Sequence, residues 1–293
     1  MRKVKKAATP YLFLLPTILL MVILLVIPIC MIFQYSFLNN AIVEKNPVFV
    51  GLENYSEILS DRDFWNAAKN TLFFVVVSVA AHIVLGMAFA MLLNSSYFGT
   101  KTKTIARVIY VLPWMFTASV IAILWKLMLQ PQGVIDYLLS FLDLATKDSE
   151  WLSSRSLALY TITFVNIWCG YPFYMISLLA GLQGISYDLY ECSALDGASS
   201  LQQFAYITIP QLKPILISIS MLDFVWSIQS FAVIWMLTGG GPVKTTETLS
   251  IYIYKLAFNS SKYALASATS VIVLIICIII AVFYVRQQKK ARE

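Results

Sequence analysis

The sequence has 293 residues, of which 59% are hydrophobic and only 12% are charged, and its mean hydropathy is +0.77. A soluble domain carries about 25% charged residues, so this chain has too few charges to cover a globular core of its size. The net charge of +6 does not indicate nucleic-acid binding, because the cations stand in short clusters at the ends of apolar runs. Composition therefore predicts an integral membrane protein surrounded by a lipid bilayer.

Apolar runs of about 20 residues recur along the chain, and each is long enough to cross a hydrocarbon layer roughly 30 Å thick. Backbone polar groups inside a bilayer must be satisfied by the chain itself, so each run is either a helix or part of a closed barrel. Barrel strands alternate over about 10 residues, whereas these runs are continuous, which indicates helices. In chain order the six expected spans are Leu12–Phe37, Thr71–Asn94, Ile105–Leu129, Leu157–Leu182, Pro214–Met236 and Tyr263–Val285.

The first expected span follows four basic residues, as the apolar region of a signal peptide does. It is longer than the 7–15 residues typical of that region and no small-residue cleavage site follows it, so we expect a membrane anchor. Basic clusters at both ends and between the second and third spans favour cytoplasmic termini. After the fifth span Lys244, Lys255 and Lys262 outnumber Glu247, which argues the other way. Residues 1–293 are expected to form one multi-pass transmembrane domain.

The linker between the fourth and fifth expected spans has about 30 residues, far more than a simple turn needs. The segment Asp188–Ala194 is compatible with a helix whose early acidic residues complement the helix dipole. Gly197 is expected to break that helix, because glycine accepts backbone angles that other residues resist. Ser199 or Ser200 can cap a second short helix, which Pro210 is expected to end. Two short helices bent at a glycine predict a compact projection from the cytoplasmic ends of the spans, which we call the knob.

The knob could rest on lipid as an interfacial helix or fit into a protein partner. The linker carries no Lys or Arg before Lys213, and its acids Asp188, Glu191 and Asp196 would be repelled by anionic headgroups. These charges favour the protein partner.

Three ordered motifs resemble the permeases of ABC importers and together cover nearly the whole chain. The linker resembles the EAA loop of that family, with Cys192 and Ser193 in place of the usual two alanines. The segment Leu237–Pro242 with Thr248-Leu249 and Tyr252, and the opening Tyr11–Pro16 with Gly51–Tyr55, resemble the carbohydrate-uptake branch, similar to the maltose and glycerol-phosphate permeases. The linker residues that the resemblance assigns to ATPase coupling are Glu191, Cys192, Ser193, Asp196, Gly197, Ala198, Phe204, Ile207 and Pro210.

The resemblance implies an all-α membrane protein with the type I ABC importer permease fold, in which residues 183–213 form a cytoplasmic coupling loop. It implies a bacterial or archaeal cell membrane, a carbohydrate substrate, a second homologous permease subunit, a cytoplasmic ABC ATPase dimer and an extracytoplasmic solute-binding protein. ATP and Mg would be bound by the partner ATPase and no cofactor by this chain. The chain itself is expected to be non-catalytic, since it has no P-loop motif, no metal-like cysteine spacing and only one histidine.

Polar residues inside a membrane span are costly, so they are functional candidates. The candidate substrate-pathway residues are Asn166, Gly170, Phe173, Trp226, Ser227 and Ser230. The first three share one helix face by their i, i+4, i+7 spacing, and Asp223, Ser227 and Ser230 repeat that rhythm. Sugars stack on aromatic faces and hydrogen-bond to polar side chains, and the resemblance to maltose-type permeases implies the same positions, Asn166 excepted. The alternative is that small and polar residues only hold the helices together.

Asp223 could be a proton relay of an ion-coupled secondary carrier, a structural hydrogen-bond partner, or a residue near the cytoplasmic end of its span. No basic side chain stands near it in the sequence, and His82 is expected to be a satisfied packing residue. A secondary carrier would also predict inverted repeats and paired intramembrane charges, which the sequence does not show. The resemblance and these features together favour one pore-forming subunit of an ATP-driven sugar importer.

Overall fold

The computed structural model describes residues 13–40, 42–95, 97–141 and 150–290. These residues form helices and turns with one isolated antiparallel bridge between Leu38 and Phe49, which confirms the all-α expectation. Among them, five helices are long and apolar enough to cross a membrane, and one bent pair of helices could supply a sixth span. Leu12, where the first expected span begins, and the basic residues before it lie outside the described residues.

The chain divides by its internal contacts into two units. The first contains residues up to Phe64 together with Ile253–Ile276, and the second contains Trp65–Tyr252 and the residues from Cys277 onward. The elements of the first unit are the helix Phe13–Tyr35, which includes the π-turn η1 (Val22–Val26) and α2 (Ile27–Tyr35), then α3 (Glu53–Ser60), η3 (Lys255–Asn259) and the first part of α14 (Tyr263–Lys290).

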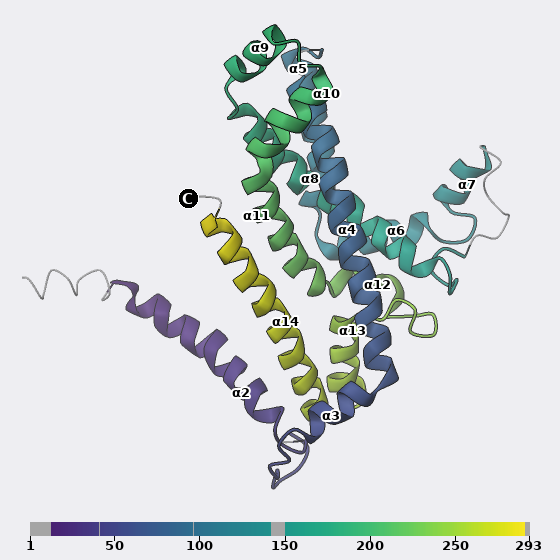
Figure 1. Cartoon of the computed structure of the whole chain (residues 1–293). Helices are drawn as coiled ribbons and strands as arrows, with labels where there is room; N and C mark the ends of the chain where they lie inside the picture. The colour runs from purple at the N-terminus through teal and green to yellow at the C-terminus, as the bar shows by residue number, and fades with distance from the viewer. Residues whose placement is uncertain (1–12, 41, 96, 142–149, 291–293) are drawn as a thin grey trace, which may run out of the picture. The chain divides into compact units, whose positions relative to one another are not determined.

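The second unit holds most of the helices, including nearly all of α4. In chain order they are α4 (Arg62–Asn94), α5 (Thr100–Met115), α6 (Ala118–Met128), α7 (Val134–Ser140), α8 (Ala158–Gln183), α9 (Tyr187–Leu195), α10 (Ser200–Gln203), the π-turn η2 (Phe204–Thr208), α11 (Ile209–Ile228), α12 (Ala232–Thr238) and α13 (Leu249–Tyr254). Figure 1 shows α9 and α10 at the end of α11 that lies away from α12.

Two asparagines organise the first unit around the turns that follow α2. The side chain of Asn40 donates to the Ser261 carbonyl at 2.9 Å and accepts from the Tyr263 amide at 2.9 Å, so it joins this turn to the start of α14. The side chain of Asn54 donates to the carbonyls of Ser36 and Leu38 at 2.9 and 3.0 Å. These bonds satisfy backbone carbonyls that no helix supplies with partners.

The apolar core of the second unit lies where α8 packs against α4 and α11. Its fully buried members include Tyr174, Met175 and Leu178 of α8, which meet Ala90 of α4 and Leu212 of α11. The remaining surface of these helices is largely apolar and exposed, as lipid-facing helices require.

The third expected span, Ile105–Leu129, is not one helix. It divides into α5 and α6, which are bent by 98° relative to one another. Phe116 and Thr117 both take extended backbone angles, and the Thr117 side chain accepts a hydrogen bond from the Val120 amide at 3.4 Å. An extended residue followed by an extended capping threonine starts a new helix in a new direction. This bend leaves no trace in hydropathy.

The fifth expected span, Pro214–Met236, differs in two ways. Its helix begins earlier, because the helical run Ser200–Ile228 continues through Pro210 instead of ending there. The π-turn η2 precedes that proline, so the hydrogen-bond pattern has already shifted where the proline lacks its N–H. The span also ends earlier, because the chain leaves the helix at Gln229 and starts α12 only at Ala232.

Candidate functional site

Three helices of the second unit meet at a buried group of polar side chains centred on Asp223 of α11. The Nδ1 atom of His82, on α4, lies 2.8 Å from Asp223 Oδ2, and the Tyr174 hydroxyl, on α8, donates to the same oxygen at 3.0 Å. The Ser227 hydroxyl donates to Oδ1 of Asp223 at 3.2 Å. We call these four side chains the polar cluster. All four residues are buried.

The polar cluster corrects the sequence-based picture of an isolated acid. Asp223 has a basic partner in His82, and the two residues come from different helices, so no local spacing could reveal the pair. The expectation that His82 is a satisfied buried residue is confirmed, because its Nε2 atom also lies 3.1 Å from the backbone carbonyl oxygen of Asn166.

Glycines allow α4 and α8 to come close at the polar cluster. A Cβ added to Gly170 would lie 2.3 Å from the imidazole of His82, and one added to Gly86 would lie 2.3 Å from Tyr174 Cβ. Real side chains do not approach so closely, so both positions require glycine for helix packing. The packing alternative stated for Gly170 therefore has a direct structural basis.

Three aromatic rings from three helices form a row next to the polar cluster. The ring centroids of Trp114 (α5) and Phe173 (α8) are 6.0 Å apart, and those of Phe173 and Trp226 (α11) are 5.5 Å apart. Both tryptophans are 50% exposed. We call these residues the aromatic row. Phe173 also contacts Tyr174 edge to face, with ring centroids 6.1 Å apart, so the row and the polar cluster touch.

The structure separates the six sequence-based pathway candidates into three groups. Phe173 and Trp226 belong to the aromatic row. The Ser227 side chain, the Asn166 carbonyl and the backbone of Gly170 belong to or contact the polar cluster. Ser230 lies beyond the end of α11, where its carbonyl accepts a hydrogen bond from Ser250 at 2.7 Å, so the expected helix face does not extend to it.

Trp114 belongs to the aromatic row but was missed by sequence reasoning. The sequence-based pathway candidates all come from the fourth and fifth expected spans, which carry the polar and aromatic residues suited to a sugar. The available signal was an aromatic residue directly after Pro113 inside the third apolar run.

The linker folds as the expected knob, which we define as residues Tyr187–Thr208. Helix α9 ends at Leu195, Gly197 turns the chain with a φ of +81°, and Ser199 begins the next helix in a capping box with Gln202. A positive φ of this size favours glycine. The end of the first short helix at Gly197 and the cap at Ser199 could thus both be predicted from the local sequence.

Side-chain hydrogen bonds join α9 to the α10–η2 segment within the knob. The Gln203 side chain donates to the Tyr190 carbonyl at 3.1 Å and to the Ser193 hydroxyl at 2.9 Å, and the hydroxyls of Tyr190 and Thr208 lie 2.9 Å apart. Ser193, one of the two departures from the family motif, therefore has a bonding role that alanine could not fill.

The outer surface of the knob is apolar and acidic. Tyr187, Leu195, Leu201 and Tyr206 are between 72% and 89% exposed. The acidic residues Asp188, Glu191 and Asp196 and the thiol of Cys192 are also exposed, while Phe204 and Ile207 are half-buried against the helices. Large exposed apolar side chains on a projection held by its own hydrogen bonds are typical of a protein interaction surface.

The glycine-rich loop 237–248 is fixed to the start of α4 by hydrogen bonds. The Asn70 side chain donates to the carbonyls of Lys244 and Glu247 at 3.2 and 3.0 Å, and Asn66 donates to the Lys244 carbonyl at 2.9 Å. The Leu249 amide donates to the Thr71 hydroxyl at 2.8 Å. These bonds give the loop a defined shape although much of it has no regular structure.

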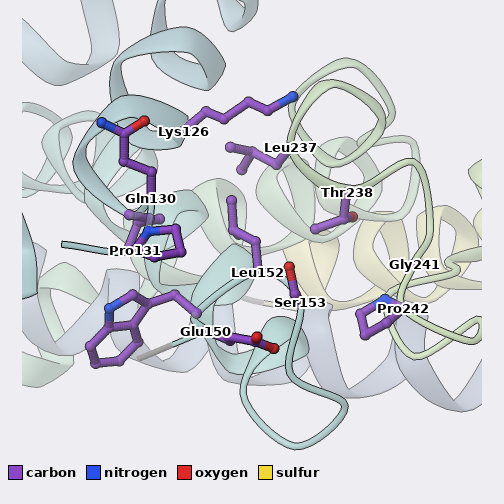
Figure 2. Close-up of a pocket in the computed structure, with 12 residues that line it drawn as sticks. Lys126, Gln130, Pro131, Glu150, Leu152, Ser153, Leu237, Thr238, Gly241 and Pro242 are labelled. Carbon is purple, nitrogen blue, oxygen red and sulfur yellow. The ribbon is translucent and has the colours of Figure 1, made fainter. Parts of the chain in front are cut away.

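This loop forms one wall of a cavity of about 390 Å³. Figure 2 shows Gln130 and Pro131 on one side and Thr238, Gly241 and Pro242 on the other, with Glu150 and Ser153 below and between them. Trp151 also lines the cavity, and its indole N–H donates to Asp136 at 2.6 Å.

Within the described ranges, no three His, Cys, Asp or Glu side chains lie close enough to hold a metal ion. The polar cluster has one histidine and one carboxylate, and a protein metal site usually has three or four ligands. The polar cluster offers hydrogen-bonding groups and the aromatic row offers stacking faces.

The sequence of this chain is similar to those of permease subunits from transport systems. The sequence model of the family described as "Binding-protein-dependent transport system inner membrane component" matches residues 82–293. The trehalose/maltose transport system permease protein MalF of Thermococcus litoralis is 32% identical over 99% of this chain and 97% of its own length. The diacetylchitobiose uptake system permease protein DasB of Streptomyces coelicolor is 29% identical over 98% of this chain and 88% of its own length.

A solved structure shares the fold over nearly all of this chain. A chain of a bacterial ABC transporter involved in the import of the acidic polysaccharide alginate superposes with a TM-score of 0.85, at 24% identity, covering 99% of this chain and 98% of that chain.

Proposed function

Because the chain belongs to the family of inner-membrane components of binding-protein-dependent transport systems, we propose that it is one pore-forming subunit of an ATP-driven importer of sugars or oligosaccharides. The observation that carries the substrate class is the aromatic row of Trp114, Phe173 and Trp226. Two relatives are named for the transport of trehalose/maltose and diacetylchitobiose, which supports the same class. The permease fold expected from the motifs agrees with the likeness to the alginate transporter.

The aromatic row suits a sugar because the C–H faces of a pyranose stack on aromatic rings while its hydroxyls stay available for hydrogen bonds. The exposed faces of Trp114 and Trp226 offer such surfaces on two helices, with Phe173 between them. A second homologous permease subunit would cover these exposed rings, so each subunit would supply half of the translocation pathway. The row then guides the sugar between the two subunits.

The knob is the proposed contact with a cytoplasmic ABC ATPase dimer. It matches the EAA motif through Glu191, Asp196 and Gly197, and it exposes Leu195 and Leu201 on a projection fixed by its own hydrogen bonds. ATP and Mg would be bound by the ATPase, and this chain would transmit force without catalysing hydrolysis. The residues proposed to couple this chain to the ATPase are the nine that the EAA-loop resemblance assigns, from Glu191 to Pro210.

A continuous helical path joins the knob to the aromatic row. The run Ser200–Ile228 begins inside the knob and carries both Asp223 and Trp226. When ATP closes the partner ATPases, movement of the knob in its socket would be transmitted along this run to the row. The translocation pathway along the aromatic row would then open alternately to the outside and to the inside of the cell. This is a two-state transition biased by ATP binding.

This arrangement also sets the proposed orientation. A cytoplasmic knob at the start of the run Ser200–Ile228 puts the glycine-rich loop 237–248 near the extracytoplasmic face, where the solute-binding protein would deliver the sugar. Both termini would then lie in the cytoplasm of a bacterial or archaeal cell. Labelling of single cysteines at Tyr97 and at Tyr137 with a membrane-impermeant maleimide on intact cells tests this, because only the second should react.

The function is tested by reconstituting the chain in proteoliposomes with its partner permease, ATPase and sugar-loaded binding protein. Sugar uptake should require ATP and all four components. A preparation that lacks the ATPase is the matched control and should not import sugar. Uptake by this chain alone, driven by an ion gradient, would overturn the proposal in favour of a secondary carrier.

A further inference from the structure

We propose that His82, Asp223 and Tyr174 form a positioning triad for sugar transport, a proton-sharing hydrogen-bond network that sets how α8 and α11 present the aromatic row. The inference rests on the proposed function, since the sugar is what the row would bind. It gives a role to buried titratable groups that the transport mechanism above does not use.

The first step concerns the proton that the two titratable groups share. The Nε2 atom of His82 faces a backbone carbonyl, that of Asn166, which can only accept, so Nε2 carries a hydrogen. The Nδ1 atom faces Asp223 Oδ2 at 2.8 Å, which leaves two arrangements. Either the imidazole is protonated and donates to a carboxylate, or Asp223 holds the proton and donates to Nδ1. Both arrangements give the pair one shared proton and no net charge.

The second step concerns burial. His82, Asp223 and Tyr174 are 1%, 8% and 0% exposed, and each belongs to a helix that is long and apolar enough to cross a membrane. An unpaired charge there would be strongly unfavourable, whereas a neutral pair with every donor and acceptor satisfied is tolerated. The Tyr174 and Ser227 hydroxyls supply the remaining donors to the carboxylate. The network therefore has a partner for each of its polar atoms.

The third step connects the network to the pathway. Tyr174 directly follows Phe173 on α8, and Asp223 stands one turn before Trp226 on α11. The Tyr174–Asp223 hydrogen bond fixes the rotation of each helix about its axis, because a rotation would separate the two side chains. That rotation also determines the distance between the rings of Phe173 and Trp226, which is 5.5 Å.

The fourth step explains why a polar network is suited to this role. Apolar side chains pack with many nearly equivalent rotations, whereas hydrogen bonds between fixed atoms have one satisfied arrangement. Buried polar groups are best attested as devices that fix register. His82 adds the third helix, since its ring occupies the space next to Gly170 where a side chain of α8 would otherwise lie. Helices α4, α8 and α11 would therefore hold the row in one geometry.

The experiment measures ATP-dependent sugar uptake by the reconstituted complex, with KM and kcat determined separately. Tyr174→Phe removes one hydroxyl and keeps the ring, and should raise the KM for binding-protein-delivered sugar about 3- to 10-fold with little change in kcat. Asp223→Asn should raise this KM about tenfold or more, because His82 loses the carboxyl group with which it shares a proton. The double variant His82→Gln with Asp223→Asn, an uncharged amide pair, should have a KM nearer to that of the unmodified protein than Asp223→Asn alone.

Ser78→Ala is the matched control, because Ser78 is a buried residue one turn from His82 on α4 whose hydroxyl has no hydrogen-bond partner among the residues that the structure describes. It should leave KM unchanged. If Tyr174→Phe and the double variant have an unchanged KM, or lower only kcat or the amount of assembled complex, the triad is merely structural and the proposal is overturned. If Asp223→Asn fails to assemble, Tyr174→Phe still decides. Absence of uptake by the unmodified complex would instead overturn the proposed function.

Discussion

The ring of Phe173 lies 5.5 Å from the indole of Trp226, so two helices that the knob separates in sequence meet again at an aromatic contact. On one side this contact continues to Trp114, and on the other it touches the buried polar cluster through Tyr174. The environment of a substrate bound at the rings would therefore depend on the packing of four helices, α4, α5, α8 and α11.

The first prediction tests stacking at the aromatic row. Trp226→Ala should raise the KM for sugar uptake about fivefold, because a ring contact is worth about 1 kcal/mol beyond its buried area. Trp226→Phe keeps a stacking face and should have a smaller effect. Uptake kinetics of the reconstituted complex provide the measurement.

Tyr97→Ala is the control for this series, since Tyr97 is 91% exposed and lies outside the row. Trp114→Ala should behave as Trp226→Ala does if both tryptophans line the pathway. Equal kinetics for all four variants and the unmodified complex would remove the row from the substrate pathway.

The second prediction concerns the close approach of α4 and α8. Gly170→Ala should destabilise the purified protein by about 1–3 kcal/mol, because the added methyl group would overlap the ring of His82. Thermal unfolding in detergent measures this change. Gly99→Ala is the matched control, since an added Cβ there meets nothing within 4 Å, and identical unfolding temperatures for the two variants would contradict the close contact.

Much of the fold was predictable because hydropathy is a local property. The fourth expected span, Leu157–Leu182, differs from α8 by one residue at each end. The bend at Phe116-Thr117 and the break at Gln229 were not predictable in the same way, because both lie inside continuous apolar runs. An apolar run fixes burial in lipid but carries no information on the angle between its halves.

The candidate site likewise has features that the local sequence predicts and contacts that it does not. The turn at Gly197 and the cap at Ser199 were predictable, because each depends on neighbouring residues. The contact of His82 with Asp223 and the meeting of Trp114 with Phe173 depend on how distant helices pack, and one sequence carries no sign of that. Polar side chains inside spans therefore pointed to α8 and α11, whose rings meet in the structure, but left their partners on other helices undefined.

The third prediction concerns the anchor of the glycine-rich loop. Asn70→Leu should lower the free energy of unfolding by about 1–3 kcal/mol, because the carbonyls of Lys244 and Glu247 would each lose a hydrogen-bond donor in a buried or half-buried setting. Faster protease cleavage within residues 237–248 should accompany the loss. Asn66→Leu removes a single exposed bond and should have the weaker effect, and the reverse order would show that Asn70 is not the main anchor.

The fourth prediction addresses the knob. Gly197→Pro should reduce sugar uptake on the order of tenfold while ATP hydrolysis continues, because proline holds φ near −65° and Gly197 has a φ of +81°. Glu191→Lys should uncouple in the same way by reversing a charge on the exposed surface that we propose as the contact with the ATPase. Uptake and ATPase activity of the same proteoliposomes give the coupling ratio directly. Glu57→Lys, an exposed charge reversal on α3, is the control and should leave that ratio unchanged. Normal coupling in both knob variants, at normal levels of assembled complex, would mean that force enters this subunit elsewhere.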